Sequence, residues 1–325
     1  MTQEEPSRAN VVQAAKVLQG HVHRTPVVTS KSLSALTTGN LLFKCENLQK
    51  VGAFKIRGAT HAIAKLTAEQ LALGVCTHSS GNHAQALACA AKETGIKCWV
   101  VMPENSAKPK IAATKGYGAN IIFSAPSAAE REKTLRRVQA ETGATFIPPY
   151  DHVDIIAGQG TLMLEFLQQA KEMDMPLDAV LVPVGGGGML SGCALACDQT
   201  QTTVYGAEPL EADDAARGFH SGARVTEVQV TTIADGLRTP VGVQNFEIIK
   251  KHVADIFTVT EEQIVEAMRL VMERMKLVVE PSGAVPLAVA LFNEDFKRLQ
   301  LAGNIGIVFS GGNVDFGRGM PWLAG

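Results

Sequence analysis

Residues 179–192 read Ala-Val-Leu-Val-Pro-Val-Gly-Gly-Gly-Gly-Met-Leu-Ser-Gly. The first six residues form an apolar run, as expected of a strand that helices cover on both faces of a sheet. Four glycines stand between that strand and a helix-like segment. Because glycine lacks a Cβ, their backbone N–H groups can converge on an anion, and the helix N-terminus behind them favours negative charge. The segment therefore predicts a phosphate-binding loop.

The spacing of these glycines restricts the phosphate that the loop can hold. The pattern G-x-G-x-x-G fails in every register, because its last glycine would fall on Leu190 or Ser191. No Gly-Lys-Ser/Thr follows, as a P-loop requires. The loop therefore disfavours a dinucleotide or a nucleoside triphosphate and suits a single phosphate monoester. A flexible turn is the alternative interpretation.

Outward from this loop, apolar strand-like runs alternate with longer helix-like segments. Strands are expected at 41–45, 75–78, 98–102, 121–123, 179–184, 204–207 and 305–309. Helices are expected at 83–93, 130–141, 160–171, 261–275 and 285–292. This alternation predicts an α/β fold with a mainly parallel sheet.

Two breaks in the alternation predict a division into lobes. One break lies near Gly74, and the other lies at Ile147-Pro148-Pro149-Tyr150, where two prolines interrupt the pattern. We expect a large domain formed by residues 1–73 and 150–325, with a small domain of residues 74–149 inserted in it. In such folds the ligand occupies the crevice at the carboxyl ends of the strands.

The composition narrows the class of partner. The chain has 325 residues, 46% of them hydrophobic, with 30 basic and 32 acidic residues and a formal net charge of −2. No basic block indicates nucleic acid or an anionic membrane as a partner. No apolar run approaches the roughly 18–20 residues of a membrane span, and the first six residues lack an apolar signal core. Six cysteines without a C-x-x-C pair predict buried, reduced thiols in a cytoplasmic protein.

The segment Val51-Gly52-Ala53-Phe54-Lys55-Ile56-Arg57-Gly58-Ala59 follows the strand expected at 41–45. A lysine in such apolar surroundings has a lowered pKa and can form a Schiff base. Taken alone, Lys55 is more readily interpreted as a surface lysine. Together with a phosphate-binding loop, Lys55 indicates a pyridoxal-phosphate site, because that cofactor needs a lysine for its aldehyde and a loop for its single phosphate group.

A third segment, His78-Ser79-Ser80-Gly81-Asn82-His83, leads from an expected strand into an expected helix. Small hydroxyl groups before a helix N-terminus suit a carboxylate ligand. Ordinary helix capping by a serine or asparagine is the alternative.

Four segments occur in a fixed order: Gly-Ala-Phe-Lys-Ile-Arg-Gly-Ala, Ser-Ser-Gly-Asn-His, Gly-Gly-Gly-Gly-Met-Leu and Ser310-Gly-Gly-Asn-Val-Asp315. Together they resemble the serine racemase and serine/threonine dehydratase branch of the fold-type II (tryptophan-synthase-β-like) pyridoxal-phosphate enzymes. The resemblance runs from about Arg24 to Asp315. It implies two open, mainly parallel sheets flanked by helices, an active site between a large and a small lobe, pyridoxal 5′-phosphate as cofactor, and a homodimer that takes small amino-acid substrates.

The resemblance also implies roles for individual residues. Lys55 resembles the Schiff-base lysine. The other cofactor-binding positions that it implies are Phe54 beside the ring, Asn82 at the ring hydroxyl, Gly185, Gly186, Gly187, Gly188 and Met189 at the phosphate, and Ser310 at the pyridine nitrogen. The substrate-binding positions that it implies are Ser79, Ser80, Gly81, His83 and Arg131. A neutral Ser310 would leave the ring nitrogen largely unprotonated, which favours prompt elimination.

Two outcomes are open once a proton has left the substrate's α-carbon. Lys55 is the natural base on one face, and Ser80 matches the position of the second acid in the serine racemases that the chain resembles. Return of the proton from the Ser80 face gives racemisation. Loss of the β-hydroxyl gives an oxo acid and ammonia. The leading hypothesis is therefore a serine racemase with L-serine and L-threonine dehydratase (ammonia-lyase) activity.

Other functions remain as alternatives at this stage. One is a dedicated threonine or 3-hydroxyaspartate dehydratase, which Arg131 would suit if its side chain faces the cleft. A more distant one is β-replacement, as in cysteine synthases, although those enzymes usually show a Thr-Ser-Gly-Asn-Thr loop. A ligand-binding protein without catalysis is disfavoured by the intact Lys55.

Two accessory sites are also implied. Glu208, the Ala212 carbonyl and Asp214 lie in an acidic segment that, on the residues alone, reads as a solvated loop or as oxygen ligands for a hard cation. Its pattern resembles the divalent-cation site of serine racemases, which implies Mg²⁺, or Ca²⁺ or Mn²⁺. The family resemblance further implies ATP as an effector, at positions matched here by Lys50, Gln85, Tyr117 and Lys276, while Lys31 departs from the expected small polar residue.

Overall fold

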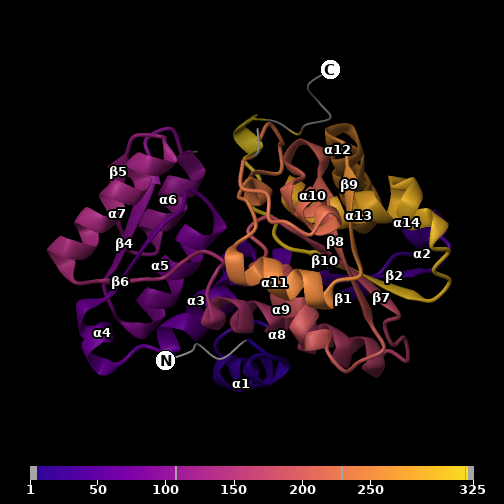
Figure 1. The fold of residues 1–325 in the computed structure, drawn as a ribbon, viewed down its shortest axis with the longest axis horizontal. Helices are drawn as coiled ribbons and strands as arrows, with labels where there is room; N and C mark the ends of the chain where they lie inside the picture. Colours follow the sequence, from indigo (N-terminus) through magenta and orange to yellow (C-terminus); the bar gives the residue numbers. More distant parts are fainter. Residues whose placement is uncertain (1–5, 107, 228–229, 319, 321–325) are drawn as a thin grey trace.

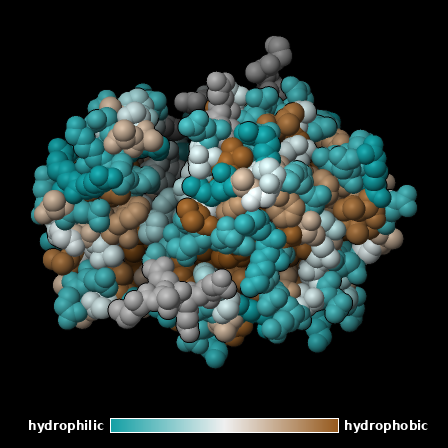
Figure 2. Space-filling model, viewed as in Figure 1, coloured by the Kyte–Doolittle hydropathy of each residue, from teal (hydrophilic) through white to brown (hydrophobic). Residues whose placement is uncertain are grey.

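The computed structural model describes residues 6–106, 108–227, 230–318 and 320. It has two lobes, each built around its own open sheet (Figure 1). The space-filling view shows the lobes as two bulges with a furrow between them, and their visible surface is mostly hydrophilic (Figure 2). The α/β architecture with two sheets flanked by helices, predicted from the sequence, is confirmed.

The larger sheet has six strands in the order β1-β2-β10-β7-β8-β9. Only the β1–β2 pair is antiparallel, and the other neighbouring pairs are parallel. The bounds of these strands are Val27–Thr29 (β1), Asn40–Cys45 (β2), Ala179–Pro183 (β7), Thr203–Pro209 (β8), Asp255–Val259 (β9) and Asn304–Phe309 (β10). The last strand of the sequence thus lies in the middle of the sheet.

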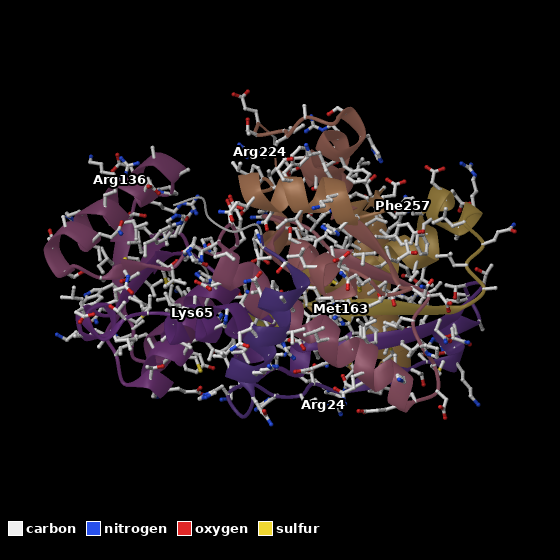
Figure 3. The ribbon with its side chains drawn as sticks, turned by 60° about the horizontal axis from the view of Figure 1, so that its bottom comes forward. Arg24, Lys65, Arg136, Met163, Arg224 and Phe257 are labelled. Atoms are coloured by element: carbon white, nitrogen blue, oxygen red, sulfur yellow. The ribbon has the colours of Figure 1, made fainter. Side chains whose placement is uncertain are left out.

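Helices cover both faces of this sheet. Val180 and Val182 of β7 point into one core, whereas Leu181 points into the other, as the two-residue period of a strand requires. The first core is shared with α1 (Arg8–Leu18), α8 (Val153–Glu172), α9 (Gly188–Cys197), α10 (Asp214–Ser221) and α11 (Val243–His252). The second core is shared with α2 (Lys31–Ser34), α12 (Glu261–Leu270), α13 (Pro281–Phe292) and α14 (Glu294–Arg298). In Figure 3, Met163 of the first core lies inside this lobe, whereas Arg24 lies at its edge.

The smaller sheet has four parallel strands in the order β5-β4-β3-β6. Their bounds are Val75–His78 (β3), Cys98–Pro103 (β4), Asn120–Ser124 (β5) and Thr145–Phe146 (β6). The helices of this lobe are α3 (Lys55–Ala64), α4 (Ala68–Leu73), α5 (Asn82–Thr94), α6 (Lys108–Gly116) and α7 (Ala128–Thr142). The α3 side chains Ile56 and Ala59 belong to the same core as α5 and β4. Part of this core thus comes from residues before position 74. The domain limits at residues 74 and 149 stay a prediction.

Short helical segments complete the described chain. They are the 3₁₀ turns η1 (Glu46–Leu48), η2 (Lys50–Gly52), η3 (Leu210–Ala212), η4 (Asp235–Leu237) and η6 (Phe316–Arg318), and the π-helical turn η5 (Val271–Met275). The helix expected at 261–275 therefore changes to π geometry in its last turn. All six cysteines are buried and free, as predicted. No helix within the described ranges has both the length and the apolar character that crossing a membrane requires.

Candidate active site

Lys55 is the first residue of α3, between the two sheets. Its Nζ donates a hydrogen bond of 2.7 Å to the carbonyl oxygen of Pro149 and lies 5.1 Å from the centre of the Phe54 ring. Burial lowers the pKa of the Lys55 amine from 10.5 to about 8. At neutral pH it therefore holds about 300-fold more neutral, nucleophilic amine than an ordinary lysine.

The glycine loop meets the requirements of a phosphate cradle. The backbone N–H groups of Gly185, Gly186 and Gly187 donate to no other described residue, and they precede α9. Gly187 has a φ of +92°, which glycine adopts without strain. The loop is therefore a set of unpaired backbone donors at a helix N-terminus, which is the chemistry that binds a phosphate monoester.

The linking segment, residues 147–152, joins the smaller sheet to α8 and supports this loop. The Tyr150 ring packs so closely that a Cβ on Gly186 would lie 2.3 Å from Tyr150 Cγ. Side-chain oxygens of Asp151 accept hydrogen bonds from the backbone N–H groups of Val243, Gln244 and Asn245, which caps α11. Glycine at position 186 is therefore required by packing as well as by the donor geometry.

The segment after β10 lies beside the Lys55 segment. The carbonyl oxygen of Ser310, which is 2% exposed, accepts a hydrogen bond from the Phe54 N–H, and an isolated bridge joins Ala53 to Gly311. The structure thus brings Ser310 next to Phe54, the residue before Lys55. Their cofactor contacts stay a prediction.

The Ser79-Ser80-Gly81 loop leads from β3 into α5. The Gly81 N–H donates to Ser79 Oγ, and Ser80 is half-buried. Asn82, the first residue of α5, donates from Nδ2 to Glu280 Oε1 at 2.7 Å. The loop is therefore tied to the larger lobe through the Asn82 side chain.

Two histidines near the site do not act as bases in this geometry. His83 Nε2 lies 3.1 Å from the carbonyl oxygen of Ile147, and burial, with the Lys55 charge, lowers its pKa to about 3. The ring is therefore neutral and carries its proton on Nε2, because a carbonyl only accepts. The His152 side chain caps α8 by accepting from the Asp154 N–H. These contacts give His83 a hydrogen-bonding role and His152 a capping role, while the substrate contact expected of His83 stays a prediction.

Arg131 lies in the first turns of α7, where its side chain is half-buried. Its Nε is buried and has no hydrogen-bond partner among the described residues. Burial lowers the pKa of His78, and the Arg131 charge lowers it further. Burial raises the pKa of Tyr150, and the Arg131 charge partly offsets that rise. Arg131 therefore lies near the end of β3 and near the tyrosine that packs on the glycine loop, and its contact with a substrate stays a prediction.

An ion pair crosses this crevice. Lys110 of α6, in the smaller lobe, pairs with Asp235 of η4, in the larger lobe. Lys110 Nζ would also lie 3.9 Å from a Cβ at Gly81. The pair therefore holds the Ser79-Ser80-Gly81 loop of one lobe near the glycine loop of the other.

The acidic segment places two buried carboxyl groups close together. Glu208 accepts hydrogen bonds from the backbone N–H groups of Ala215 and Ala216, and Asp214 accepts from Val241 N. Burial raises the pKa of both carboxyls, that of Asp214 to about 6, and the nearby Asp214 charge raises the pKa of Glu208 further. Buried carboxyl oxygens are the kind of ligand that a hard divalent cation takes, and a cation here stays a prediction. Ala212 is buried beside them.

Three of the four candidate nucleotide residues come together, on or near α5. Lys50 pairs with Glu93 of α5, and Gln85 lies buried on the same helix. Burial raises the pKa of Tyr117, and Cys89 of α5 is close enough to raise it further. Lys276 lies elsewhere, after the π turn, with a φ of 60° and an Nζ bond to the Glu273 carbonyl. No described contact joins it to the other three.

A buried ion cluster next to Lys55 was missed by the sequence reasoning. Arg57 donates to both oxygens of Glu46 and both oxygens of Glu165, and Lys44 donates to Glu165. The side chains of Lys44, Glu46 and Arg57 are 0% exposed. A signal was present, because Lys44 and Glu46 are charged residues at the end of an otherwise apolar strand.

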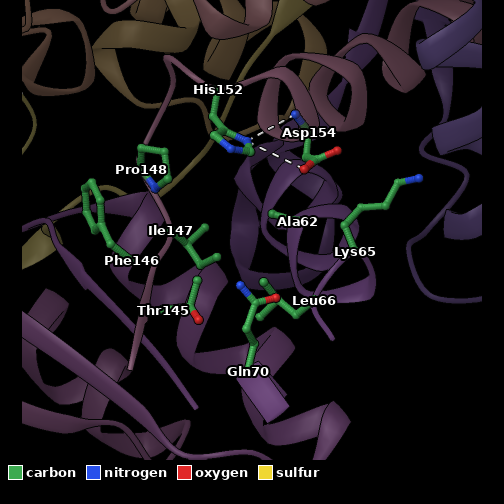
Figure 4. A pocket seen from close by; sticks show the side chains of 10 residues that line it. All are labelled: Ala62, Lys65, Leu66, Gln70, Thr145, Phe146, Ile147, Pro148, His152 and Asp154. Carbon is green, nitrogen blue, oxygen red and sulfur yellow. Dashed lines mark hydrogen bonds and ion pairs between the residues drawn. The ribbon is translucent and has the colours of Figure 1, made fainter. Parts of the chain in front are cut away.

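A cavity of about 210 Å³ is lined in part by Ile147, Pro148 and His152 of the linking segment (Figure 4). Its lining comes from α3, α4, β6 and the start of α8, and the side chains of Gln70, Thr145 and Ile147 surround it. None of the residues predicted for the cofactor or the substrate lines it.

Comparisons with known proteins agree with this geometry. A family model described as "Pyridoxal-phosphate dependent enzyme" matches residues 18–311. The chain is 43% identical to a beta-hydroxyaspartate dehydratase of Paracoccus denitrificans, over 98% of this chain and 99% of that protein. It is 44% identical to a serine racemase of Arabidopsis thaliana, over 95% and 93%. The crystal structure of a serine racemase from Dictyostelium discoideum superimposes with a TM-score of 0.90 at 43% identity, covering 95% of this chain and 99% of that one.

Proposed function

Because this chain belongs to the family of pyridoxal-phosphate dependent enzymes, we propose that it is a serine racemase that also dehydrates L-serine and L-threonine. The observation that carries the proposal is the desolvated amine of Lys55, which lies between the Phe54 ring and the linking segment. The serine racemases among its relatives support the choice of substrate.

Residues of both lobes would hold the cofactor. Gly185, Gly186 and Gly187 offer their N–H groups to its phosphate, and Lys55 offers an amine to its aldehyde. Asn82 and Ser310 would face the ring hydroxyl and the ring nitrogen. When bound, pyridoxal phosphate supplies a conjugated ring that withdraws electrons from the substrate's α-carbon.

Two side chains would move the substrate's α-proton. Lys55 Nζ takes the proton from one face, and its lowered pKa suits an acid–base group near neutral pH. Ser80 Oγ returns a proton from the other face, which gives D-serine. When the β-hydroxyl leaves as water instead, and water later releases the nitrogen, L-serine becomes pyruvate and ammonia, so the net reaction balances.

The proposal is tested by incubating the holoenzyme with L-serine and quantifying D-serine and pyruvate in the same samples. We expect both products to accumulate. Formation of neither product would overturn the proposal, and pyruvate without D-serine would restrict it to dehydration. Parallel reactions with L-threonine and 3-hydroxyaspartate establish which substrate has the highest kcat/KM.

Replacing Ser80 with alanine should reduce D-serine formation by at least about 100-fold, the usual contribution of a positioned acid or base. Pyruvate formation should change only a few-fold, because elimination needs the Lys55 face alone. The measurement is the ratio of D-serine to pyruvate from L-serine. An unchanged ratio in Ser80→Ala would refute the role of Ser80.

A second candidate function is dehydration of 3-hydroxyaspartate, and Arg131 is the observation that favours it. The half-buried side chain has a buried Nε without a partner among the described residues, and its charge reaches Tyr150 beside the glycine loop, near which a second substrate carboxylate would lie. A beta-hydroxyaspartate dehydratase is among the relatives that match the chain over nearly its whole length.

Replacing Arg131 with glutamine distinguishes the two functions. A lost charge-assisted hydrogen bond of about 1.5–3 kcal/mol corresponds to roughly a 10- to 150-fold lower kcat/KM for 3-hydroxyaspartate, with little change for L-serine. Arg137→Gln is the matched control, because Arg137 lies exposed on the same helix and pairs with Glu141. Equal losses for both substrates would contradict a role in recognising the second carboxylate.

We also propose a divalent cation, Mg²⁺ in the first place, at Glu208, the Ala212 carbonyl and Asp214. The buried carboxyl groups support it, since a cation would offset the desolvation of both groups and the effect of the Asp214 charge on Glu208. Its role is structural or activating, because the cofactor already supplies the electron withdrawal.

Saturating Mg²⁺ should raise the thermal midpoint of unfolding after treatment with EDTA. At a hundredfold excess over Kd the expected stabilisation is about 2.7 kcal/mol, which is a shift of several degrees. The double variant Glu208→Gln, Asp214→Asn should lose this response, whereas Glu247→Gln, at an exposed carboxylate on α11, should keep it. A response that survives the double variant would place the cation elsewhere.

We propose a cytoplasmic homodimer with ATP as effector near Lys50, Gln85 and Tyr117, which the structure brings onto one face around α5. Lys276 would join them only from another part of the fold or from a second copy of the chain.

A further inference from the structure

The amide of Asn82 is held at both ends by side chains from distant parts of the chain. Asn313 Nδ2 donates to the carbonyl oxygen of Val51 at 2.9 Å and to Asn82 Oδ1 at 2.9 Å. Asn82 Nδ2 donates to Glu280 Oε1 at 2.7 Å, across 198 residues of sequence. Asn313 and Glu280 thus hold the two ends of the Asn82 amide, and Asn313 links it to a fourth segment at Val51.

The direction of every hydrogen bond in this chain of contacts is determined. A backbone carbonyl only accepts, so the atom of Asn313 that meets Val51 must be its nitrogen. The same nitrogen then donates to Asn82, whose facing atom must be oxygen. The other end of Asn82 is therefore its NH₂ group, which donates one hydrogen to Glu280 and has a second hydrogen left.

Strain in the backbone marks the same place. Val51 has a φ of 58°, a left-handed conformation that β-branched residues rarely adopt. It places its carbonyl against Asn313. Strained residues of this kind persist where the surroundings hold them and cluster at functional sites.

Glu280 is built into the site rather than exposed at its edge. It is 3% exposed, its backbone N–H donates to the Gly311 carbonyl, and its Oε2 is buried without a partner among the described residues. Burial and Asp235 raise its pKa to about 7, while Lys110 and the Asn82 bond oppose that rise. The groups that face it are thus Asn82, Asp235 and Lys110, together with the segment that follows Ser310.

We infer that Glu280 is a positioning residue, which fixes the Asn82 amide so that its remaining N–H is presented to the cofactor's ring hydroxyl. Without the Glu280 acceptor, the amide loses the partner that holds its NH₂ end. The inference rests on the proposed function, because it requires pyridoxal phosphate to lie beside Asn82.

The test compares two variants of Glu280 by cofactor binding to the apoenzyme. Glu280→Met removes the acceptor at similar volume, and the dissociation constant for pyridoxal phosphate should rise about tenfold. Glu280→Gln keeps an acceptor oxygen and should restore the affinity to within about threefold. Asn313→Ala should reproduce the Met defect from the other end of the chain of contacts.

A second readout separates positioning from a general loss of structure. The visible absorbance of the bound cofactor should change with a midpoint near neutral pH in the unsubstituted enzyme, and this step should be lost in Glu280→Gln, because a glutamine does not titrate. Thermal unfolding of the apo forms identifies any variant that fails to fold.

The outcomes are distinguishable. Unchanged affinity in Glu280→Met, or equal defects in the Met and Gln variants, would overturn the inference while leaving the proposed function intact. Absence of the absorbance band in the unsubstituted enzyme supplied with pyridoxal phosphate would instead overturn the proposed function.

Discussion

Replacing Lys55 with alanine should lower turnover of L-serine by more than about 1000-fold, because the Lys55 amine serves both as the nucleophile toward the cofactor and as the base toward the substrate. The absorbance band of bound cofactor should disappear with it. The fold should persist, since Lys55 Nζ bonds only to the Pro149 carbonyl and is paired with no carboxylate in the described part of the chain. Turnover, absorbance and thermal unfolding are measured on the same preparation.

Lys65→Ala provides the matched control, because Lys65 ends the same helix and is exposed. It should retain activity and the absorbance band. Residual racemisation in Lys55→Ala within tenfold of the unsubstituted enzyme would contradict the assignment of Lys55.

The pH dependence of cofactor uptake follows from the same amine. Only the neutral form attacks an aldehyde, and the pKa of Lys55 is lowered to about 8. The rate of uptake by the apoenzyme should therefore rise about tenfold per pH unit below that value and level off above it. A plateau reached only above pH 10 would mean that burial does not lower this pKa.

Replacing Arg57 with methionine should destabilise the protein by about 3–5 kcal/mol, the cost of removing one partner from a buried ion pair. Arg57 is 0% exposed and donates to the carboxylates of Glu46 and Glu165. Without it, Thr25 is the only side chain of the described residues that still donates a hydrogen bond to the Glu46 carboxylate. Because Arg57 lies two residues after Lys55 on α3, cofactor binding should weaken as well.

The measurement is the midpoint of urea unfolding of the apo form at a constant slope. Arg217→Met is the control, because Arg217 is exposed and its pair with Asp213 should contribute little. The double variant Arg57→Met, Glu46→Leu should recover part of the lost free energy of unfolding, because it also removes the buried, unpaired charge of Glu46. A loss below about 1 kcal/mol in Arg57→Met would show that water reaches the cluster.

Strands could be predicted from the sequence where a run of apolar residues is long enough to show that the strand is buried. The apolar run before Gly185 is a buried parallel strand, and the predicted strand at 75–78 matches β3. Strands β1 and β6 were missed because three and two residues carry no usable periodicity, and β9 was missed among polar neighbours.

The site could be predicted only in part for a similar reason. Lys55, Asn82 and the glycine loop stand in recognisable local patterns, so their neighbourhood in space follows from the fold. Glu280 has no such pattern, since the residues after it, Pro281 and Ser282, read simply as the start of a helix. Its role depends on a contact across 198 residues, which no local property of the chain encodes.

The position of β10 has a consequence for the order in which the protein folds during synthesis. The smaller sheet is complete by residue 146, so it can form while the ribosome is still translating the larger lobe. The larger sheet cannot close until Asn304–Phe309 has emerged, because β10 separates β2 from β7. Strand β2 therefore waits for most of translation with an unpaired apolar edge, and chaperones that shield nascent chains should bind there.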